Sequence, residues 1–325
     1  MHFSRNLPTM SQSSKHIPFS STHVFSTLIN DYLEGKGNAM DFVQYAPNVD
    51  GYKAAIEGRK KYPINRTLLF DVLTKQYSNL TQEKAVNDQI ALLKKDSTFV
   101  VTTAHQPNLF TGPLYFFYKI IHAIQLAASL KAAFPECNFV PVYYMGSEDA
   151  DIEELGFVTI GGQKLVWQTK QTGAVGRMLV DVELLSLIKL IEGQIGVSVH
   201  GIAWVNLLKQ SFTIGKTIAQ ATLEIVHHLF GDYGLVVVQP DSPELKSLFT
   251  SVIEKELTTG FSNNAVQQTI KNLSVHYKVQ AAGRAINLFY LQGNKRERIV
   301  QTDAGYEVTA LGLSFTKDQI LAEVQ

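Results

Sequence analysis

One stretch of the chain, FVVTTAHQPNLFTGPLYFFYKIIHAIQLAASL from Phe99 to Leu130, constrains the fold most. It starts with a short apolar run, Phe99 to Ala104, of the kind that forms a buried strand. Polar residues follow, and after Gly112 and Pro113 apolar residues recur every three or four positions, as in a helix. A helix N-terminus that follows such a loop attracts anions, because its unpaired N–H groups and the positive end of its dipole face the loop. The sequence therefore predicts a phosphate-binding loop here.

Two further apolar runs, Phe139 to Met145 and Leu235 to Val238, are expected to be strands of the same sheet. A helix over about residues 113–133 would connect the first two strands in a right-handed βαβ unit. The predicted fold class is α/β, with a Rossmann-like parallel-sheet core. Three strands are few for a doubly wound sheet, and the chain stops at FTKDQILAEVQ inside a predicted helix. We therefore expect that further C-terminal structure is missing from this chain.

The predicted organisation has five segments. Residues 1–95 form a helical N-terminal region, and residues 96–158 form the first half of the Rossmann-like core. Residues 159–232 form a connecting insertion, with a hairpin around Gly161 and Gly162 and a helix near 204–230. The core continues over 233–260. Residues 261–325 form a second, truncated insertion with a β-hairpin that turns at Gly293 and Asn294.

Composition excludes several classes of protein. Lysine plus arginine and aspartate plus glutamate both number 29, so the formal net charge is zero and nucleic acid is not an expected partner. Cys137 is the only cysteine, which rules out an internal disulfide and a cysteine-rich zinc site. No uninterrupted apolar run of about 18 residues occurs, so we expect neither a membrane span nor a secretion signal. A cytoplasmic protein is expected.

Candidate site residues follow the first two strands, because ligands of open α/β sheets bind beyond the carboxyl ends of the strands. His105 could donate a hydrogen bond to a phosphate oxygen, or it could only bond a neighbouring carbonyl group at the strand end. Lys119 shares a helix face with Tyr115 and His122 and either reaches back toward the anion or is simply solvated, whereas His122 is interpreted as structural. The first loop also contributes Gln106, Asn108, Thr111 and Gly112.

Acidic residues follow the second predicted strand. Glu148 and Asp149 lie nearest the strand end and are candidates for holding Mg²⁺ together with nucleotide phosphates, whereas Glu153 and Glu154 suit the first turn of a helix. Further along, TGAVGR combines two glycines with Arg177, a side chain that pairs well with carboxylate or phosphate. The sequence has no phosphate loop of the Walker type, no G-x-G-x-x-G fingerprint and no H-E-x-x-H motif.

Five blocks together carry a family resemblance. They are AHQPNLFTGPLYFFYK, PVYYMGSEDADIEEL, TGAVGRM, GLVVVQPDSPELKSLF and INLFYLQG, the last followed by a basic run and FTKDQIL. In this order, over most of residues 24–325, the chain resembles the bacillithiol-biosynthesis cysteine-adding enzymes. The resemblance implies a Rossmann-like core of the nucleotidylyl-transferase and synthetase type, with connecting insertions. Family members are longer and end in a coiled coil that pairs two subunits, so this chain resembles their N-terminal portion, without that coiled coil.

The resemblance also implies an activity: an ATP-using ligase that joins L-cysteine to glucosaminyl malate to form bacillithiol. It implies cysteine, glucosaminyl malate and ATP as small-molecule partners, Mg²⁺ as a companion of the nucleotide, and a homodimer at full length. Two alternatives stay open: an adenylyltransferase with another acceptor, and a nucleotide-binding or assembly subunit without catalysis. The first family motif falls on residues 105–119, where many members have glutamine at His105 and histidine at Tyr118. The second contains Ala150 where histidine is frequent, so no histidine role transfers to 118 or 150.

Site roles carried over from the resemblance fall into three groups. The expected catalytic residues are His105 and Lys119. The expected nucleotide-binding residues are Gln106, Asn108, Thr111, Gly112 and Tyr115. The expected substrate-binding residues are Glu148, Asp149, Gly173, Gly176 and Arg177, with Glu148 and Asp149 also expected at the magnesium ion.

Overall fold

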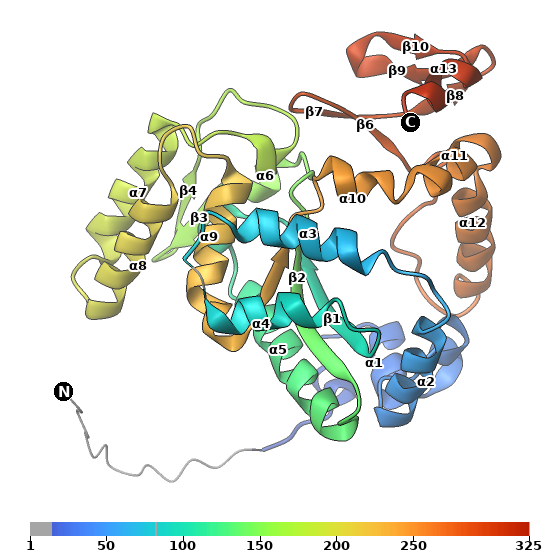
Figure 1. The fold of residues 1–325 in the computed structure, drawn as a ribbon, viewed down its shortest axis with the longest axis horizontal. Helices are drawn as coiled ribbons and strands as arrows, with labels where there is room; N and C mark the ends of the chain where they lie inside the picture. Colours follow the sequence, from blue (N-terminus) through green and yellow to red (C-terminus); the bar gives the residue numbers. More distant parts are fainter. Residues whose placement is uncertain (1–14, 82, 325) are drawn as a thin grey trace. The chain divides into compact units, whose positions relative to one another are not determined.

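The computed structural model describes residues 15–81 and 83–324, and Figure 1 shows the course of the chain. The chain folds as two compact units. One contains the described residues up to Lys61 together with Ala265–Gly283, and the other contains Tyr62–Asn264 and Arg284 onward. The five segments expected from the sequence divide the chain differently, and that division stays a prediction.

The smaller unit is helical. It contains α1 (Thr27–Glu34), α2 (Val49–Arg59) and the greater part of α12 (Phe261–Leu273). Side chains cap the first two helices, because Ser26 accepts from the amide of Ile29 and Asn48 accepts from that of Gly51. The hydroxyl of Tyr277 donates to Asp31 at 2.8 Å and so connects the two stretches of chain that form this unit.

The larger unit is built on a parallel sheet. Its strands are β1 (Thr98–His105), β2 (Asn138–Met145) and β5 (Val236–Val238), in the order β1-β2-β5. All three predicted strands are confirmed, and so is the βαβ unit, because β1 and β2 pair in parallel and α5 (Tyr115–Ala133) connects them. The expected burial of the first strand is wrong, because exposed residues alternate with less exposed ones along β1. Residues 139–143 of the central strand β2 are all buried, because helices cover both faces of the sheet.

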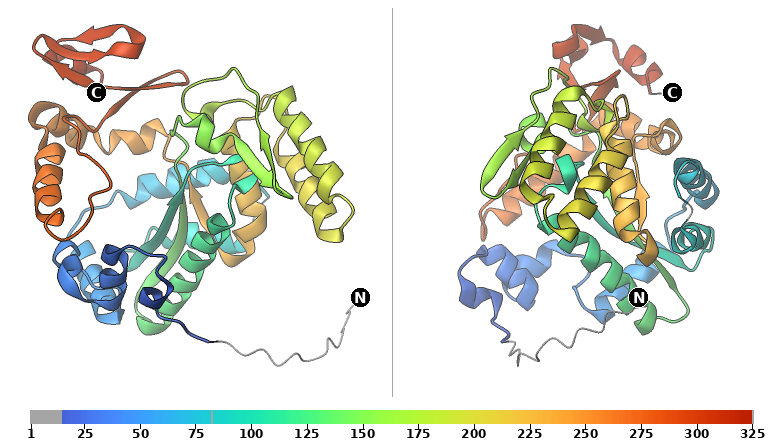
Figure 2. Two further views of the ribbon diagram at one scale, coloured as in Figure 1. Left: turned by 180° about the vertical axis from the view of Figure 1, so that it is seen from behind. Right: turned by 90° about the vertical axis from the view of Figure 1, so that its left-hand side faces the viewer.

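The two faces of the sheet are covered by different helices. In Figure 2, α3 (Arg66–Tyr77) and α4 (Lys84–Leu92) lie on one face, and α5 and α9 (Ile218–Phe230) lie on the other. Side chains from all of these elements form one core cluster, which includes Leu73, Ile90, Phe116, Tyr143 and Val226. Among the residues that the structure describes, no helix combines the length and the apolar character that crossing a bilayer requires.

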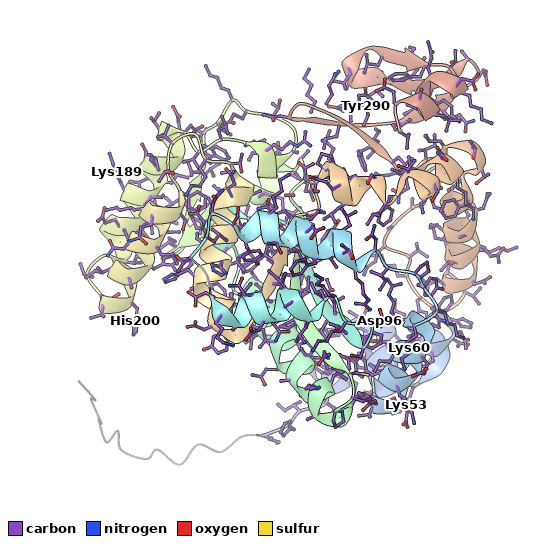
Figure 3. All side chains as sticks on the ribbon, viewed as in Figure 1. Lys53, Lys60, Asp96, Lys189, His200 and Tyr290 are labelled. Atoms are coloured by element: carbon purple, nitrogen blue, oxygen red, sulfur yellow. The ribbon has the colours of Figure 1, made fainter. Side chains whose placement is uncertain are left out.

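The connecting insertion contains α6 (Ile152–Leu155), the hairpin of β3 (Phe157–Ile160) and β4 (Gln163–Val166), α7 (Val182–Ile195) and α8 (Val199–Ser211). The hairpin around Gly161 and Gly162 is confirmed. The single helix expected near 204–230 is wrong, because the chain breaks between α8 and α9. Gly215 has a φ of 81° there, and Thr217 with Gln220 forms a capping box that starts α9. Lys189 on α7 and His200 on α8 are exposed (Figure 3).

After β5 the larger unit continues with two short helices, a hairpin and a small sheet. The helices are α10 (Pro243–Ser247) and α11 (Thr250–Thr259). The hairpin consists of β6 (Phe289–Gln292) and β7 (Lys295–Arg298), and its turn at Gly293 and Asn294 is confirmed. The small sheet contains β8 (Val300–Thr302), β9 (Gly305–Val308) and β10 (Leu313–Phe315), and α13 (Lys317–Ala322) follows.

One buried hydrogen bond connects α3 to the sheet. The amide of Val237 in β5 donates to the hydroxyl of Tyr77 at 2.7 Å, and both residues are buried. We expect Tyr77→Phe to lower the free energy of unfolding by about 1–3 kcal/mol, because a buried amide then loses its acceptor. Urea unfolding measures this, with Tyr233→Phe as the control, since Tyr233 is 67% exposed. Equal losses in the two variants would contradict the prediction.

Candidate functional site

The loops that follow β1 and β2 meet at the carboxyl edge of the sheet. His105 pairs with Met145 in the parallel register, so both loops leave the sheet at the same level. The carbonyl oxygen of His105 accepts from the amide of Gly146 at 2.8 Å and from the hydroxyl of Tyr143 at 3.0 Å. The side chain of Gln106 donates to Asp149 at 3.1 Å. The structure therefore brings together the two loops that the sequence places at one site.

The loop between β1 and α5 has an unusual backbone. Phe110, Thr111 and Gly112 all have positive φ values, of 53°, 76° and 63°. Phe110 holds this conformation through burial, with its ring edge-on to Phe212 at 5.1 Å between centroids. A Cβ atom at Gly112 would lie 2.6 Å from the Cβ atom of Asn108, so the loop requires glycine for space as well as for its φ value.

The first turn of α5 lacks a side-chain cap. The residue at the N-cap position is Leu114, whose side chain offers no hydrogen bond, although its carbonyl oxygen accepts from the amides of Phe117 and Tyr118. Asn108, which is 8% exposed, has a side-chain oxygen without a partner in the part of the chain that the structure describes. An uncapped helix N-terminus beside polar side chains is able to receive an anionic group of a ligand.

His105 lies against this first turn. Its ring is partly buried, at 5.2 Å from the ring of Tyr115 and 5.7 Å from that of Phe116 between centroids. Burial, together with the charge of Lys119, lowers the pKa of His105 to about 4, so the imidazole is neutral at pH 7. Its Nε2 atom is buried and has no partner among the described residues, so the interpretation in which this nitrogen bonds a neighbouring carbonyl is not what the structure shows.

Lys119 is directed back to the strand end. Its ammonium group donates to the carbonyl oxygen of Ala104 at 2.5 Å, one residue before His105. The long side chain thus reaches from the second turn of α5 to the carboxyl edge of β1, and a role toward an anion stays a prediction. This places a positive charge next to the loop.

The acidic residues after β2 are engaged with other side chains and amides. Asp149 accepts from Gln106 and from the amide of Asp151, and Glu148 pairs with Lys246. Within residues 15–81 and 83–324 no three histidine, cysteine, aspartate or glutamate side chains gather as metal ligands would. In this arrangement Glu148 and Asp149 do not fit a magnesium site formed by the protein alone.

Arg177 is the centre of a network of charges. Its guanidinium group donates through Nε and Nη2 to the two carboxylate oxygens of Asp241, at 2.5 and 2.6 Å, and through Nη1 to the carbonyl oxygen of Gly293. Lys246 donates to the same Asp241 at 2.6 Å and also pairs with Glu148. Burial raises the pKa of Asp241, but the hydrogen bonds from Arg177 and Lys246 outweigh it, so the pKa is lowered. Two cations and two carboxylates therefore compensate one another.

The two glycines of the TGAVGR motif allow close packing of backbone segments. Gly173 has a φ of 91°, and a Cβ atom there would lie 1.8 Å from the carbonyl oxygen of Asn294 in the β6–β7 turn. A Cβ atom at Gly176 would lie 2.5 Å from atoms of Ser147 in the loop after β2. The motif thus joins the hairpin to the edge of the sheet and presents Arg177 between them.

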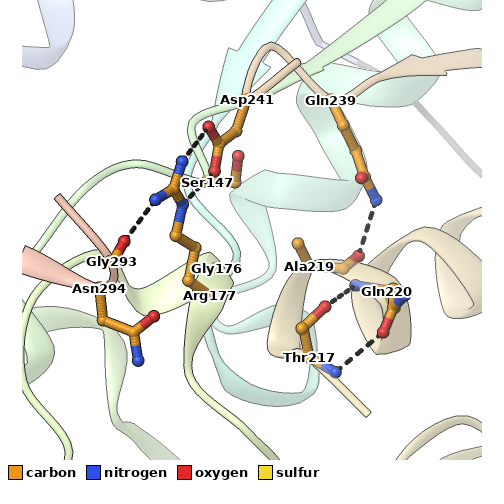
Figure 4. A pocket seen from close by; sticks show the side chains of 10 residues that line it. All are labelled: Ser147, Gly176, Arg177, Thr217, Ala219, Gln220, Gln239, Asp241, Gly293 and Asn294. Atoms are coloured by element: carbon orange, nitrogen blue, oxygen red, sulfur yellow. Dashed lines mark hydrogen bonds and ion pairs between the residues drawn. The ribbon is translucent and has the colours of Figure 1, made fainter. Parts of the chain in front are cut away.

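A pocket of about 420 Å³ lies beside this network (Figure 4). Ser147 is 2% exposed and lines the pocket, and its hydroxyl has no hydrogen-bond partner in the described part of the chain. Gly176 and Arg177 are the predicted site residues that line it, whereas His105 and the other residues of the first loop do not. Sequence reasoning placed Ser147 in the loop after the second strand without giving it a role, and it missed Gln239 and Asp241 as site residues. The place of Asp241, soon after the third predicted strand of a parallel sheet, was a usable signal.

The pKa of His105 predicts a pH dependence of stability. Between about pH 6.5 and 4 the unfolded chain binds a proton at His105 and the folded chain does not, so its contribution to stability is lost as the pH falls. We expect the free energy of unfolding of the wild type, minus that of His105→Gln, to fall over this range and to level off below about pH 4. Urea unfolding at several pH values measures this difference. A difference that stays constant with pH would show that the pKa of His105 is not lowered by folding.

The charge network predicts that the ion pair of Arg177 with Asp241 contributes more to stability than the exposed pair of Lys209 with Glu192. Arg177→Met leaves the carboxylate of Asp241, whose side chain is only 15% exposed, without two charge-assisted hydrogen bonds. We expect a loss of about 1.5–3 kcal/mol in the free energy of unfolding. The control is Lys209→Met, which breaks an exposed pair with Glu192 at 2.7 Å and is expected to cost less than about 1 kcal/mol. Similar losses would mean that the network is no stronger than a surface pair.

Comparisons with known proteins agree with this architecture. Residues 13–325 match the model of a family described as bacillithiol biosynthesis BshC, N-terminal Rossmann-like domain. The chain is 38% identical over 308 residues to a protein of Flavobacterium psychrophilum, covering 94% of this chain and 58% of the relative. It is 37% identical over 313 residues to one of Flavobacterium johnsoniae, covering 95% and 58%, and 37% identical over 315 residues to one of Cytophaga hutchinsonii, covering 96% and 58%.

All three relatives bear the name "Putative cysteine ligase BshC". The chain spans less than three fifths of the length of each. The match to the family model covers nearly the whole chain, and the parallel sheet agrees with the Rossmann-like fold that the model describes. The chain therefore belongs to the bacillithiol biosynthesis BshC family, and it matches the N-terminal Rossmann-like domain of that family.

Proposed function

We propose that the chain acts in bacillithiol synthesis, as part of a ligase that joins L-cysteine to glucosaminyl malate with ATP. Membership of the family and the cysteine ligase names of its relatives support this proposal. One structural observation carries it furthest: the unpartnered Nε2 of His105 lies beside the uncapped first turn of α5, at the carboxyl edge of a parallel sheet. Ligands of open α/β folds bind at this edge.

In this proposal the first loop holds the phosphate groups of the nucleotide. A neutral imidazole still provides one N–H donor, so His105 can donate a hydrogen bond to a phosphate oxygen at pH 7. The amide of Tyr115, the first residue of α5, adds a donor in a direction that the helix dipole favours, whereas the amides of Phe116 and Phe117 already donate to the carbonyl oxygens of Pro113 and Leu114. Lys119 supplies a positive charge at the strand end, while Gln106, Asn108, Thr111, Gly112 and Tyr115 form the wall around the nucleotide.

The chemical step follows from this placement. The cysteine carboxylate would displace pyrophosphate from ATP, and the amine of glucosaminyl malate would then displace AMP and lose a proton as the amide forms. Donors placed where the phosphate charge grows lower the barrier, which is the role proposed for His105 and Lys119. No step is assigned to Mg²⁺, because Glu148 and Asp149 are already engaged. A homodimer remains part of the proposal for the longer protein.

Cysteine-dependent exchange between ATP and labelled pyrophosphate tests the proposal. We expect exchange that His105→Ala lowers about 10- to 100-fold, the effect of losing one hydrogen bond to a charged group. The matched control is His122→Ala, because His122 is an exposed histidine on the same connecting helix and should leave the rate unchanged.

The other outcomes separate the alternatives. Exchange with a different carboxylic acid, and none with cysteine, would indicate an adenylyltransferase with another acceptor. Nucleotide binding without any exchange, measured by calorimetry, would indicate a non-catalytic binding or assembly subunit. Either result would overturn the cysteine ligase.

A further inference from the structure

The pocket beside Arg177 has other polar groups than the loop between β1 and α5. Its walls come from the loop after β2, from η4 (Val175–Arg177), from the start of α9, from the segment after β5 and from the β6–β7 turn. Figure 4 shows these side chains around one hollow, with Arg177 and Asp241 joined on one side and Thr217 and Gln220 on the other. Its volume of about 420 Å³ lies within the range of small-molecule sites.

The charges at this pocket leave no cation for an anionic ligand. The fork of Arg177 is already filled by both carboxylate oxygens of Asp241, and Lys246 is shared between Asp241 and Glu148. A phosphate or carboxylate that entered would have to displace Asp241, whose own partners hold it in place. The pocket is therefore polar without an uncompensated positive charge.

Hydroxyl and side-chain amide groups supply the uncharged polar part of the remaining wall. The hydroxyl of Ser147 is buried and has no partner within the described residues, which is costly unless a ligand supplies one. The side-chain amide of Gln239 is held in one orientation because its Nε2 donates to the carbonyl oxygen of Ala219 at 3.2 Å. Thr217 accepts from the amide of Gln220, and its hydroxyl hydrogen stays available to donate. An apolar ligand would leave these groups unsatisfied.

We propose that this pocket binds an uncharged polyhydroxyl ring, that of a sugar, with Ser147 as a hydrogen-bonding partner of one of its hydroxyl groups. A sugar hydroxyl donates and accepts, so it matches a wall of hydroxyl and amide groups better than an anion or an apolar group does. The inference rests on the proposed function, in which the acceptor of the cysteinyl group is an amino sugar linked to malate. It assigns the sugar to the pocket of Ser147 and the phosphate groups to the loop of His105.

Binding measurements on the 325-residue chain, without ATP or cysteine, test this assignment. Saturation-transfer NMR and calorimetry would use methyl α-D-glucoside, glucosaminyl malate, malate and inorganic phosphate as probes. We expect the glucoside and glucosaminyl malate to bind, and Ser147→Ala to weaken both about three- to tenfold, the effect of one hydrogen bond. Because Ser147 has no protein partner, Ser147→Ala should leave the melting temperature unchanged or higher.

The controls separate binding from folding. Ser211→Ala removes another hydroxyl at a residue that is 2% exposed but lies in α8, away from this pocket, and should leave the affinities unchanged. Asn294→Ala, at an exposed turn that lines the pocket, should weaken glucoside binding without affecting stability. Three results would each overturn the assignment. The sugar affinity could be unaffected by Ser147→Ala and Asn294→Ala, the sugar could fail to bind at all, or phosphate or malate alone could bind in a way that depends on Ser147.

Failure of the proposed function and failure of the sugar site give different results. Absence of cysteine-dependent exchange together with Ser147-dependent sugar binding would overturn the ligase and leave the pocket as a sugar site. Exchange without Ser147-dependent sugar binding would leave the ligase and overturn the pocket.

Discussion

The parallel pairing of β1 with β2 is the constraint on which the candidate site depends. Because the two strands pair in register from Thr98 with Asn138 to His105 with Met145, their loops leave the sheet side by side. The further contacts follow because both loops leave the sheet at the same position. They are the hydrogen bond from Tyr143 to the carbonyl oxygen of His105, the bond between Gln106 and Asp149, and the approach of Gly176 to Ser147. The alternation along β1 favours this register, because a one-residue slip would exchange its exposed side chains with its less exposed ones.

Charge is distributed unevenly at the edge of the sheet. At the end of β1 a lysine and a neutral histidine surround an uncapped helix N-terminus, and none of the carboxylates paired near β5 reaches them in the described structure. Beside β5 the cations of Arg177 and Lys246 are fully paired with Asp241 and Glu148. One loop is therefore suited to negative groups and the neighbouring pocket to uncharged polar groups. In the proposed function, the first of these environments would hold the nucleotide and the second the sugar ring of the acceptor.

Local patterns predicted much of the fold. The apolar runs at 99–104, 139–145 and 235–238 all form strands, although only β2 and β5 are largely buried and residues of β1 alternate in exposure. The turns at Gly161 with Gly162 and at Gly293 with Asn294 form hairpins. The merged helix near 204–230 was wrong because both halves are apolar, and the break depends on the cap of Thr217. For the site, the sequence identified the two loops and Arg177 but not the partner of Arg177. Asp241 lies 64 residues further along the chain, and no local pattern connects them.

By itself the sequence determined the three strands of the parallel sheet, the connecting helix after β1 and the family of the chain, since these depend on short-range periodicity and on motifs in order. Only the tertiary structure decided that the Arg177 guanidinium is neutralised by Asp241, that the glycines of TGAVGR pack against backbone, and that the hydroxyl of Ser147 is left without a partner. These properties arise from the burial and mutual approach of segments far apart in the chain, which sequence periodicity does not encode.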